Sequence, residues 1–154
     1  MYKQIVVGTD GSAGANIAVD TAIELARLTG ATLHVVLAHD VTTAYALASV
    51  PGVAMPVDAI NESNDAMRAD AQKVTGEVIE RAGKAGVEAQ AHCVPGDAAD
   101  ALLRVAEDTG CDLVVVGNRG MTGVRRFVLG SVPNKLSHHC PSSLLIVDTG
   151  SARA

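Results

Sequence analysis

The feature that most constrains the fold of this chain is a junction that occurs three times. A stretch with helical periodicity ends in a glycine, and a short run rich in β-branched residues follows at once, after Gly30, Gly86 and Gly110. Glycine is favoured just past the last turn of a helix because it adopts the left-handed conformation without steric cost. The three junctions therefore predict alternating helices and strands, which is typical of a parallel sheet with helices on both faces.

The expected elements follow from the periodicity of the apolar residues. Strands are expected at about 3–8, 31–39, 87–94, 112–117 and 143–148. Helices are expected at about 13–29, 61–85, 97–109 and 131–139. Apolar residues at spacings of three and four define the buried helix faces: Ile17, Ala18, Ala22, Leu25 and Ala26 in the first helix, Met67, Ala71, Val74, Val78 and Ala82 in the second, and Ala98, Ala101, Leu102, Val105 and Ala106 in the third.

The strands differ in how continuously apolar they are, and this predicts their positions in the sheet. The runs 5–8 and 113–117 are apolar throughout, as expected for central parallel strands covered on both faces. The run 87–94 contains Glu88, Gln90 and His92, which suits an edge. The last strand, 143–148, is apolar although it is expected at the edge of the sheet. An exposed apolar edge strand is a surface on which a second chain can pair. We therefore expect a homodimer formed through this strand.

The size and charge of the chain exclude several classes of function. Its 154 residues suit one domain, expected at 1–150 with a short tail at 151–154. The N-terminus lacks a signal-peptide pattern and no apolar run is long enough to span a membrane, so a cytoplasmic location without membrane contact is expected. A net charge of -5 and an aromatic content of 2% argue against nucleic acid as a partner. The three cysteines are interpreted as buried, reduced thiols.

Two glycine-containing turns follow the predicted central strands. Residues 8–12, Gly-Thr-Asp-Gly-Ser, come after the first, and residues 117–120, Gly-Asn-Arg-Gly, come after the fourth. Ligands of open parallel sheets bind at the carboxyl ends of strands, where the strand order reverses. If the two strands are neighbours, these turns face one crevice. The segment 40–60 lacks clear periodicity, and we interpret it either as a mobile loop or as a lid over that crevice.

The chain beyond the second turn has the chemistry of a phosphate-binding site. It reaches Gly130-Ser131 and then a predicted helix start, where unpaired amides and the helix dipole attract anions. The spacing is neither that of the Walker loop nor that of the dinucleotide fingerprint, both of which are absent.

The pattern Gly117-x2-Gly120-x9-Gly130-Ser131, together with the turn at 8–12, resembles the ATP-binding branch of the universal stress proteins over essentially the whole chain. The resemblance implies a three-layer, open, parallel five-stranded sheet of order 3-2-1-4-5, of the adenine nucleotide alpha hydrolase-like class. It also implies dimerisation through the last strand and ATP bound between the first and fourth strands.

The same resemblance implies a set of binding residues. Thr9 and Asp10 resemble positions near adenine and ribose, and Asp40 or Val41 resembles the adenine contact. The phosphate-binding region corresponds to Val116, Gly117, Arg119, Gly120, Gly130, Ser131 and Val132. Asp10 could instead help to hold Mg²⁺ together with the phosphates, although no metal site formed by the protein alone is expected.

Some residues depart from the family pattern or have an ordinary structural interpretation. Pro133 stands where many relatives have a hydroxyl residue, and it removes one amide donor. Arg119, Arg125, Arg126 and Lys135 form a cationic cluster around the expected phosphate site, or are solvated loop charges. Asp10 and Ser12 could simply cap the first helix. His39 could line the crevice.

Three functions remain open. The first is a stress-response regulator that binds ATP. The second is a cyclic AMP-binding protein of the same fold, for which the lost amide at Pro133 matters less. The third is a slow ATP hydrolase, for which no catalytic base is evident.

Overall fold

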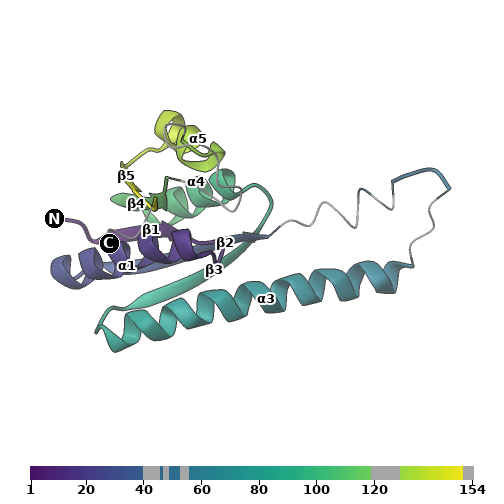
Figure 1. The fold of residues 1–154 in the computed structure, drawn as a ribbon, viewed down its shortest axis with the longest axis horizontal. Coiled ribbons are helices and arrows are strands. Elements are labelled where there is room, and N and C mark those ends of the chain that lie inside the picture. The colour runs from purple at the N-terminus through teal and green to yellow at the C-terminus, as the bar shows by residue number, and fades with distance from the viewer. Residues whose placement is uncertain (40–45, 47–48, 53–55, 119–128, 151–154) are drawn as a thin grey trace.

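The computed structural model describes residues 1–39, 46, 49–52, 56–118 and 129–150 (Figure 1). Strands and helices alternate along most of the chain. Their bounds are β1 Gln4–Gly8, α1 Ala13–Thr29, β2 Thr32–His39, α3 Val57–Lys84, β3 Ala89–Pro95, α4 Ala98–Thr109, β4 Leu113–Gly117, α5 Ser131–His139 and β5 Ser143–Val147.

The five strands form one parallel sheet of order β3-β2-β1-β4-β5, which confirms the expected order. β1 is central, and its register pairs Val6 with His34 on one side and with Val114 on the other. All three glycine junctions end their helices as expected: Gly30 and Gly110 are left-handed at the ends of α1 and α4, and Gly86 is left-handed directly after Ala85, the last cap residue of α3. The strand order reverses between β1 and β4, as the crevice hypothesis requires.

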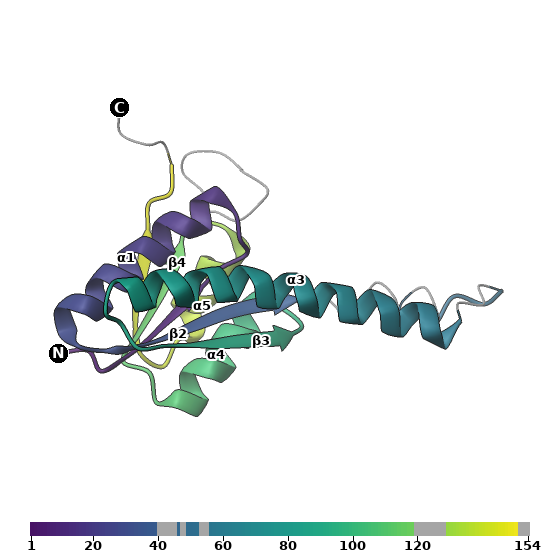
Figure 2. The ribbon, with the colours of Figure 1, turned by 90° about the horizontal axis from the view of Figure 1, so that it is seen from below.

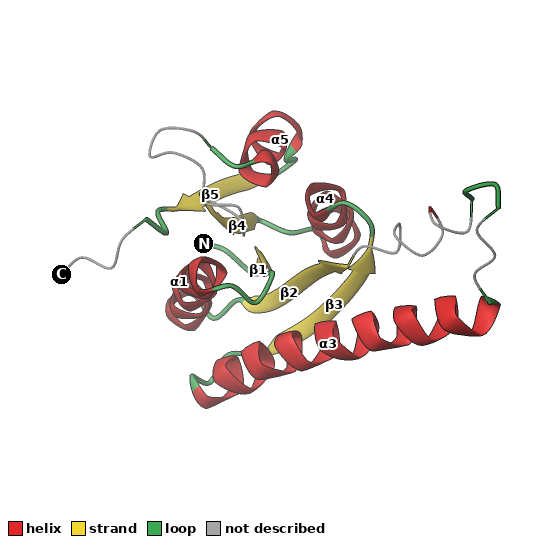
Figure 3. Cartoon of the chain, turned by 45° about the vertical axis from the view of Figure 1, so that its right-hand side comes forward, coloured by secondary structure: helices red, strands yellow, loops and turns green. Residues whose placement is uncertain are grey.

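The helices form a layer on each face of the sheet (Figure 3). α1 and α3 cover one face around a core that includes Ile5 and Leu33, and α4 and α5 cover the other around Val6 and Leu136. These four side chains have no measurable solvent exposure. Burying each one contributes about 1.5–3 kcal/mol to stability, so the two cores hold the carboxyl edge of the sheet rigidly in place.

Helix α3 departs from the sequence prediction at its start. It begins at Val57, directly after Pro56, whereas the periodicity predicted a start near residue 61 and placed 57–60 in the segment between elements. The 28-residue helix is about 42 Å long at 1.5 Å per residue, which exceeds the length of any strand. Its N-terminal half therefore extends beyond the carboxyl edge of the sheet (Figures 1 and 2).

The predicted buried faces are largely confirmed, with one clear error in α1. Ile17 is 40% exposed, whereas Ala15, Val19 and Ile23 are buried. The inner face of α1 is thus rotated relative to the predicted stripe, because small alanines allow the helix to pack closely on either side of Ala18 and Ala22.

The cysteine prediction is only partly correct: Cys111 is buried, but Cys93 and Cys140 are half-buried; all three are free thiols.

A polar cluster that the sequence did not predict crosses three strands near their amino ends. Nδ1 of His34 lies 3.0 Å from Nε2 of His92, and Nε2 of His34 lies 2.7 Å from Oε1 of Gln4. Burial lowers the pKa of both histidines, and the facing ring of His92 lowers that of His34 further. The neutral imidazoles are therefore the forms that this fold favours.

Candidate functional site

The turn after β1 is held by hydrogen bonds from its own side chains. The Thr9 amide donates to the Val36 carbonyl of β2 at 2.9 Å, and Thr9 Oγ1 accepts from the Gly11 amide at 3.2 Å. Oδ1 of Asp10 accepts from the Ser12 amide at 2.9 Å, and Ser12 Oγ caps α1 by accepting from Ala15. The capping interpretation is thus confirmed for Ser12. Asp10 bends the turn, and its exposed carboxylate keeps an oxygen for a ligand.

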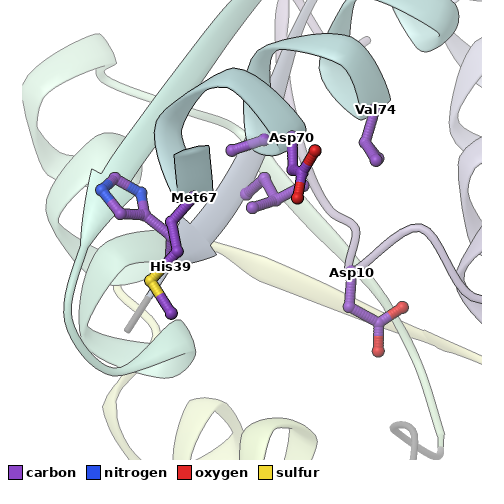
Figure 4. Close-up of a pocket in the computed structure, with 7 residues that line it drawn as sticks. Asp10, His39, Met67, Asp70 and Val74 are labelled. Atoms are coloured by element: carbon purple, nitrogen blue, oxygen red, sulfur yellow. The ribbon is translucent and has the colours of Figure 1, made fainter. Parts of the chain in front are cut away.

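A pocket of about 230 Å³ opens beside this turn, on the face of the sheet covered by α3. Its lining combines apolar side chains from β2 and α3 with three polar ones, as shown in Figure 4: Asp10, Leu37, His39, Met67, Asp70, Ala71 and Val74. His39 lines the pocket, in agreement with its proposed position at the crevice.

His39 is also the polar group in this pocket that most needs a partner. Its Nδ1 atom is buried and has no hydrogen-bond partner among the described residues. A buried imidazole nitrogen without a partner costs about 1–3 kcal/mol. The nitrogen itself is closed to solvent, so the accessible polar groups of the pocket are the exposed carboxylates of Asp10 and Asp70, and together with the apolar wall they suit a partly polar organic molecule.

The sequence analysis did not identify the contribution of α3 to this pocket. Met67 and Val74 were assigned to the buried stripe of the helix, but both are half-buried and face the pocket, and Asp70 lies beside them. Since the helix extends past the sheet edge, its stripe changes there from core to pocket lining. The missing information was where along α3 the sheet edge lies, which the periodicity of the helix does not reveal.

The start of α5 offers hydrogen-bond donors at the same edge of the sheet. Ser131 and Val132 are the first helical residues, and within the described chain their amides donate to no other group. Pro133 has no amide hydrogen, and the Asn134 amide already bonds to the Gly130 carbonyl at 3.1 Å. The helix start therefore presents two amides and the Ser131 hydroxyl, a combination suited to one phosphate group.

The Gly130 amide is not free to bind an anion, contrary to the simplest interpretation of the glycine motif. It donates to the Asn118 carbonyl at 3.0 Å. The side chain of Asn118 accepts from the amide and hydroxyl of Thr149 at 3.0 and 2.7 Å and donates to Asp148 at 2.9 Å. Asn118 thereby joins the ends of β4 and β5 to the start of α5, and Gly130 acts as an anchor.

Lys135 contributes less positive charge to this region than expected. Its Nζ atom lies 2.8 Å from Asp100 and 3.2 Å from Asp97, so it joins α5 to the start of α4. Those hydrogen bonds raise the pKa of Lys135. The Asp100 amide lowers the pKa of Asp97, with help from Lys135. Lys135 is therefore neutralised by two carboxylates and is not part of a free cationic cluster.

The remaining expected ligand-binding residues divide into two groups. Val116 is only 3% exposed and its side chain packs in the core beneath α4, so a ligand could contact only its main chain. Gly117 is half-buried and pairs with Val147 at the carboxyl edge. Asp40, Val41, Arg119 and Gly120 lie outside the described residues, as do Arg125, Arg126 and most of the segment interpreted as a loop or lid.

An open parallel sheet with helices on both faces, a pocket at its carboxyl edge and a helix start whose first amides have no partner among the described residues defines an α/β protein of the open parallel-sheet class. The family model described as "Universal stress protein family" matches residues 1–148. The chain therefore belongs to the universal stress protein family. No helix of the described residues has the length and apolar character needed to cross a membrane.

Similar proteins place the chain within this family over nearly its whole length. Universal stress protein YxiE of Bacillus subtilis is 32% identical over 151 residues, covering 96% of this chain and 99% of that protein. A universal stress protein crystallised in complex with cAMP is 30% identical, with a TM-score of 0.70 over 97% of this chain and 98% of that one. The protein from Archaeoglobus fulgidus in complex with dAMP is 21% identical, with a TM-score of 0.64 over 96% and 98%, and supports the fold alone.

Proposed function

We propose that this protein binds an adenine nucleotide across the carboxyl edge of its sheet and that ATP is its ligand. The observation that carries the proposal is the combination, at one edge, of a partly apolar pocket rimmed by two carboxylates and a helix start at which two amides have no partner among the described residues. The first suits a nucleoside and the second a phosphate group. A universal stress protein that is 30% identical to this chain was crystallised in complex with cAMP, which supports an adenine nucleotide as the ligand.

In this proposal the nucleoside lies near Thr9, Asp10 and the pocket beneath α3, with Asp40 or Val41 contacting the base. The phosphates lie against Ser131 and Val132, and the main chain at Val116 and Gly117 together with Arg119, Gly120 and Gly130 completes that side. Gly130 takes part by fixing the helix start, since its amide is bonded to Asn118. Asp10 accepts from ribose or shares Mg²⁺ with the phosphates.

Cyclic AMP is the second candidate, and one observation favours it. The start of α5 provides two amides and one hydroxyl, because the Gly130 amide is engaged and Pro133 has none. This set satisfies one phosphate group, whereas a triphosphate needs further donors from elsewhere. The 30% identical protein was crystallised with cAMP.

Replacing Ser131 with proline tests the proposed phosphate site. Proline is tolerated at the first helical position, and Gly130 already has φ -60° and ψ 166°, which suit a residue before proline. Ser131→Pro removes one amide and the hydroxyl while the helix start is kept. Hydrogen bonds to charged groups contribute about 1.5–3 kcal/mol each, so affinity for ATP or cyclic AMP should fall at least about tenfold.

Isothermal titration calorimetry with ATP and with cyclic AMP, each with and without Mg²⁺, measures this effect. Ser131→Ala, which removes only the hydroxyl, should lose less affinity than Ser131→Pro. An unchanged affinity in a folded Ser131→Pro protein would show that phosphate does not bind at this helix. The ratio of the two wild-type affinities decides between the candidates.

We further propose that the protein acts as a homodimer, paired through β5, in a stress-response regulatory role. β5 is the outer strand next to β4, and its apolar residues from Leu144 to Val147 are only half-buried in the single chain. An uncovered apolar edge supports pairing with a second copy.

A further inference from the structure

The pocket beneath α3 has an unusual charge for a protein that binds phosphorylated ligands. Asp10 and Asp70 both line it, and within the described chain no lysine or arginine forms an ion pair with either carboxylate. One oxygen of Asp10 is engaged by the Ser12 amide, whereas Asp70 has no hydrogen-bond partner among the described residues. The polar rim of the pocket is therefore dominated by hydrogen-bond acceptors.

The rest of the lining is apolar and comes from β2 and α3. Leu37 and Ala71 are buried, and Met67 and Val74 are half-buried beside them. In Figure 4, Asp70 and Asp10 appear as separate carboxylates that reach the pocket from α3 and from the turn after β1. A phosphate group would be repelled from this space, while a neutral ring bearing an N–H donor would satisfy both the apolar wall and the carboxylate.

The nucleobase is the part of an adenine nucleotide that fits this description. Adenine has an exocyclic amine that donates hydrogen bonds, whereas guanine has a carbonyl at the equivalent position that only accepts them. Hypoxanthine, the base of inosine nucleotides, also has a carbonyl there. A carboxylate can accept from the amine but is repelled by the carbonyl oxygen.

We propose that Asp70 is a specificity-determining residue that accepts a hydrogen bond from the exocyclic amine of the bound adenine. This role rests on the proposed nucleotide-binding function and extends it from the shared edge of the sheet to a named side chain of α3. The alternative is that Asp70 is an ordinary solvated residue on a helix surface, like Asp65 on the same helix.

The test compares ATP with ITP, in which a carbonyl replaces the exocyclic amine and the neighbouring ring nitrogen N1 carries a hydrogen. Wild-type protein should bind ATP at least about tenfold more tightly than ITP. With ITP the Asp70 carboxylate loses its hydrogen bond from the amine and faces a carbonyl oxygen instead. In Asp70→Asn the side-chain amide can accept from the amine of ATP and donate to the carbonyl of ITP, so the two affinities should differ by no more than a few fold. Both carboxylates are exposed, but Asp65 does not line the pocket, so Asp65→Asn makes the same chemical change outside it and should keep the wild-type ratio of affinities.

The outcomes separate this proposal from the function on which it rests. If wild-type protein binds neither nucleotide, the proposed function fails. If it binds ATP and ITP equally, or if Asp70→Asn keeps the wild-type ratio, nucleotide binding stands and the role of Asp70 is wrong. A reduced ratio in Asp70→Asn with an unchanged ratio in Asp65→Asn supports the role. The individual affinities exclude a general loss of pocket shape, which would weaken binding of both nucleotides, whereas the proposed role predicts that Asp70→Asn binds ATP less tightly and ITP more tightly than wild type.

Discussion

Gly11, in the turn after β1, is the position where a single added methyl group most directly tests the site geometry. Its φ of +78° is left-handed, and a Cβ built there would lie 3.3 Å from both methyl carbons of Val74 in α3. The left-handed conformation costs a residue other than glycine about 1–2 kcal/mol. Overpacking typically destabilises a fold by about 1–3 kcal/mol. Because Val74 is only half-buried and can move away from the added methyl group, we expect the lower value of about 1 kcal/mol here. Gly11→Ala should therefore lower the free energy of unfolding by about 2–3 kcal/mol.

Gly30 provides a matched control for the backbone contribution. It has a φ of +71°, but no heavy atom lies within 4 Å of the added Cβ. Gly30→Ala should therefore show only the backbone cost of about 1–2 kcal/mol. Combining Gly11→Ala with Val74→Ala should recover about 1 kcal/mol relative to additivity, because the double variant lacks the close contact.

Urea denaturation followed by far-UV circular dichroism measures these differences, since the chain has no tryptophan. At a slope of about 2 kcal/mol per molar urea, the midpoint of Gly11→Ala should fall by roughly 1–1.5 M. Equal losses in Gly11→Ala and Gly30→Ala, or additive effects in the double variant, would refute the close contact between the turn and α3. The same displacement of Val74 should weaken ATP binding in Gly11→Ala and leave it unchanged in Gly30→Ala.

Three further perturbations test other parts of the structure. Folding lowers the pKa values of His34 and His92, so below about pH 6.5 the unfolded chain binds more protons than the folded chain. The free energy of unfolding, measured in urea, should therefore be constant above that pH and fall as the pH decreases toward the lowered pKa values. A free energy of unfolding that does not change with pH in this range would contradict the buried histidine pair. Asn118→Ala removes three side-chain hydrogen bonds and should lower the free energy of unfolding by about 1.5–3 kcal/mol in the same assay. A loss below about 0.5 kcal/mol, which is typical of an ordinary surface substitution, would mean that the ends of β4 and β5 hold together without this side chain. Leu145→Lys should convert the proposed dimer to a monomer in light scattering, with Leu28→Lys on the exposed surface of α1 as the control; an intact dimer in the first variant would remove β5 as the interface.

The central and edge strands of the sheet could be predicted from properties that are local in sequence, whereas the full strand order was implied by the family resemblance. Continuous apolar runs marked β1 and β4 as central strands, and glycines at helix ends marked the junctions. The phase of α1 could not be predicted as well, since Ile17 and Val19 are similarly apolar and only packing against the sheet selects Val19.

The site was predictable at its edge but not in its contacts. The motif glycines indicated which ends of which strands meet, but no sequence pattern shows that the Gly130 amide is engaged by Asn118 or that Lys135 pairs with Asp97 and Asp100. Those contacts depend on how α4 and α5 lie relative to each other in three dimensions. The role of Asp70 was hidden for the same reason, since it depends on how far α3 extends past the sheet.

The hydrogen bond from the Gly130 amide to the Asn118 carbonyl ties the start of α5 to the carboxyl end of β4. Asn118 is bonded in turn to Thr149 and Asp148, which follow β5. A change that moves the ends of β4 and β5 would therefore also move the amides of Ser131 and Val132. An event at the outer strand of the sheet could in this way alter how well the start of α5 holds an anion.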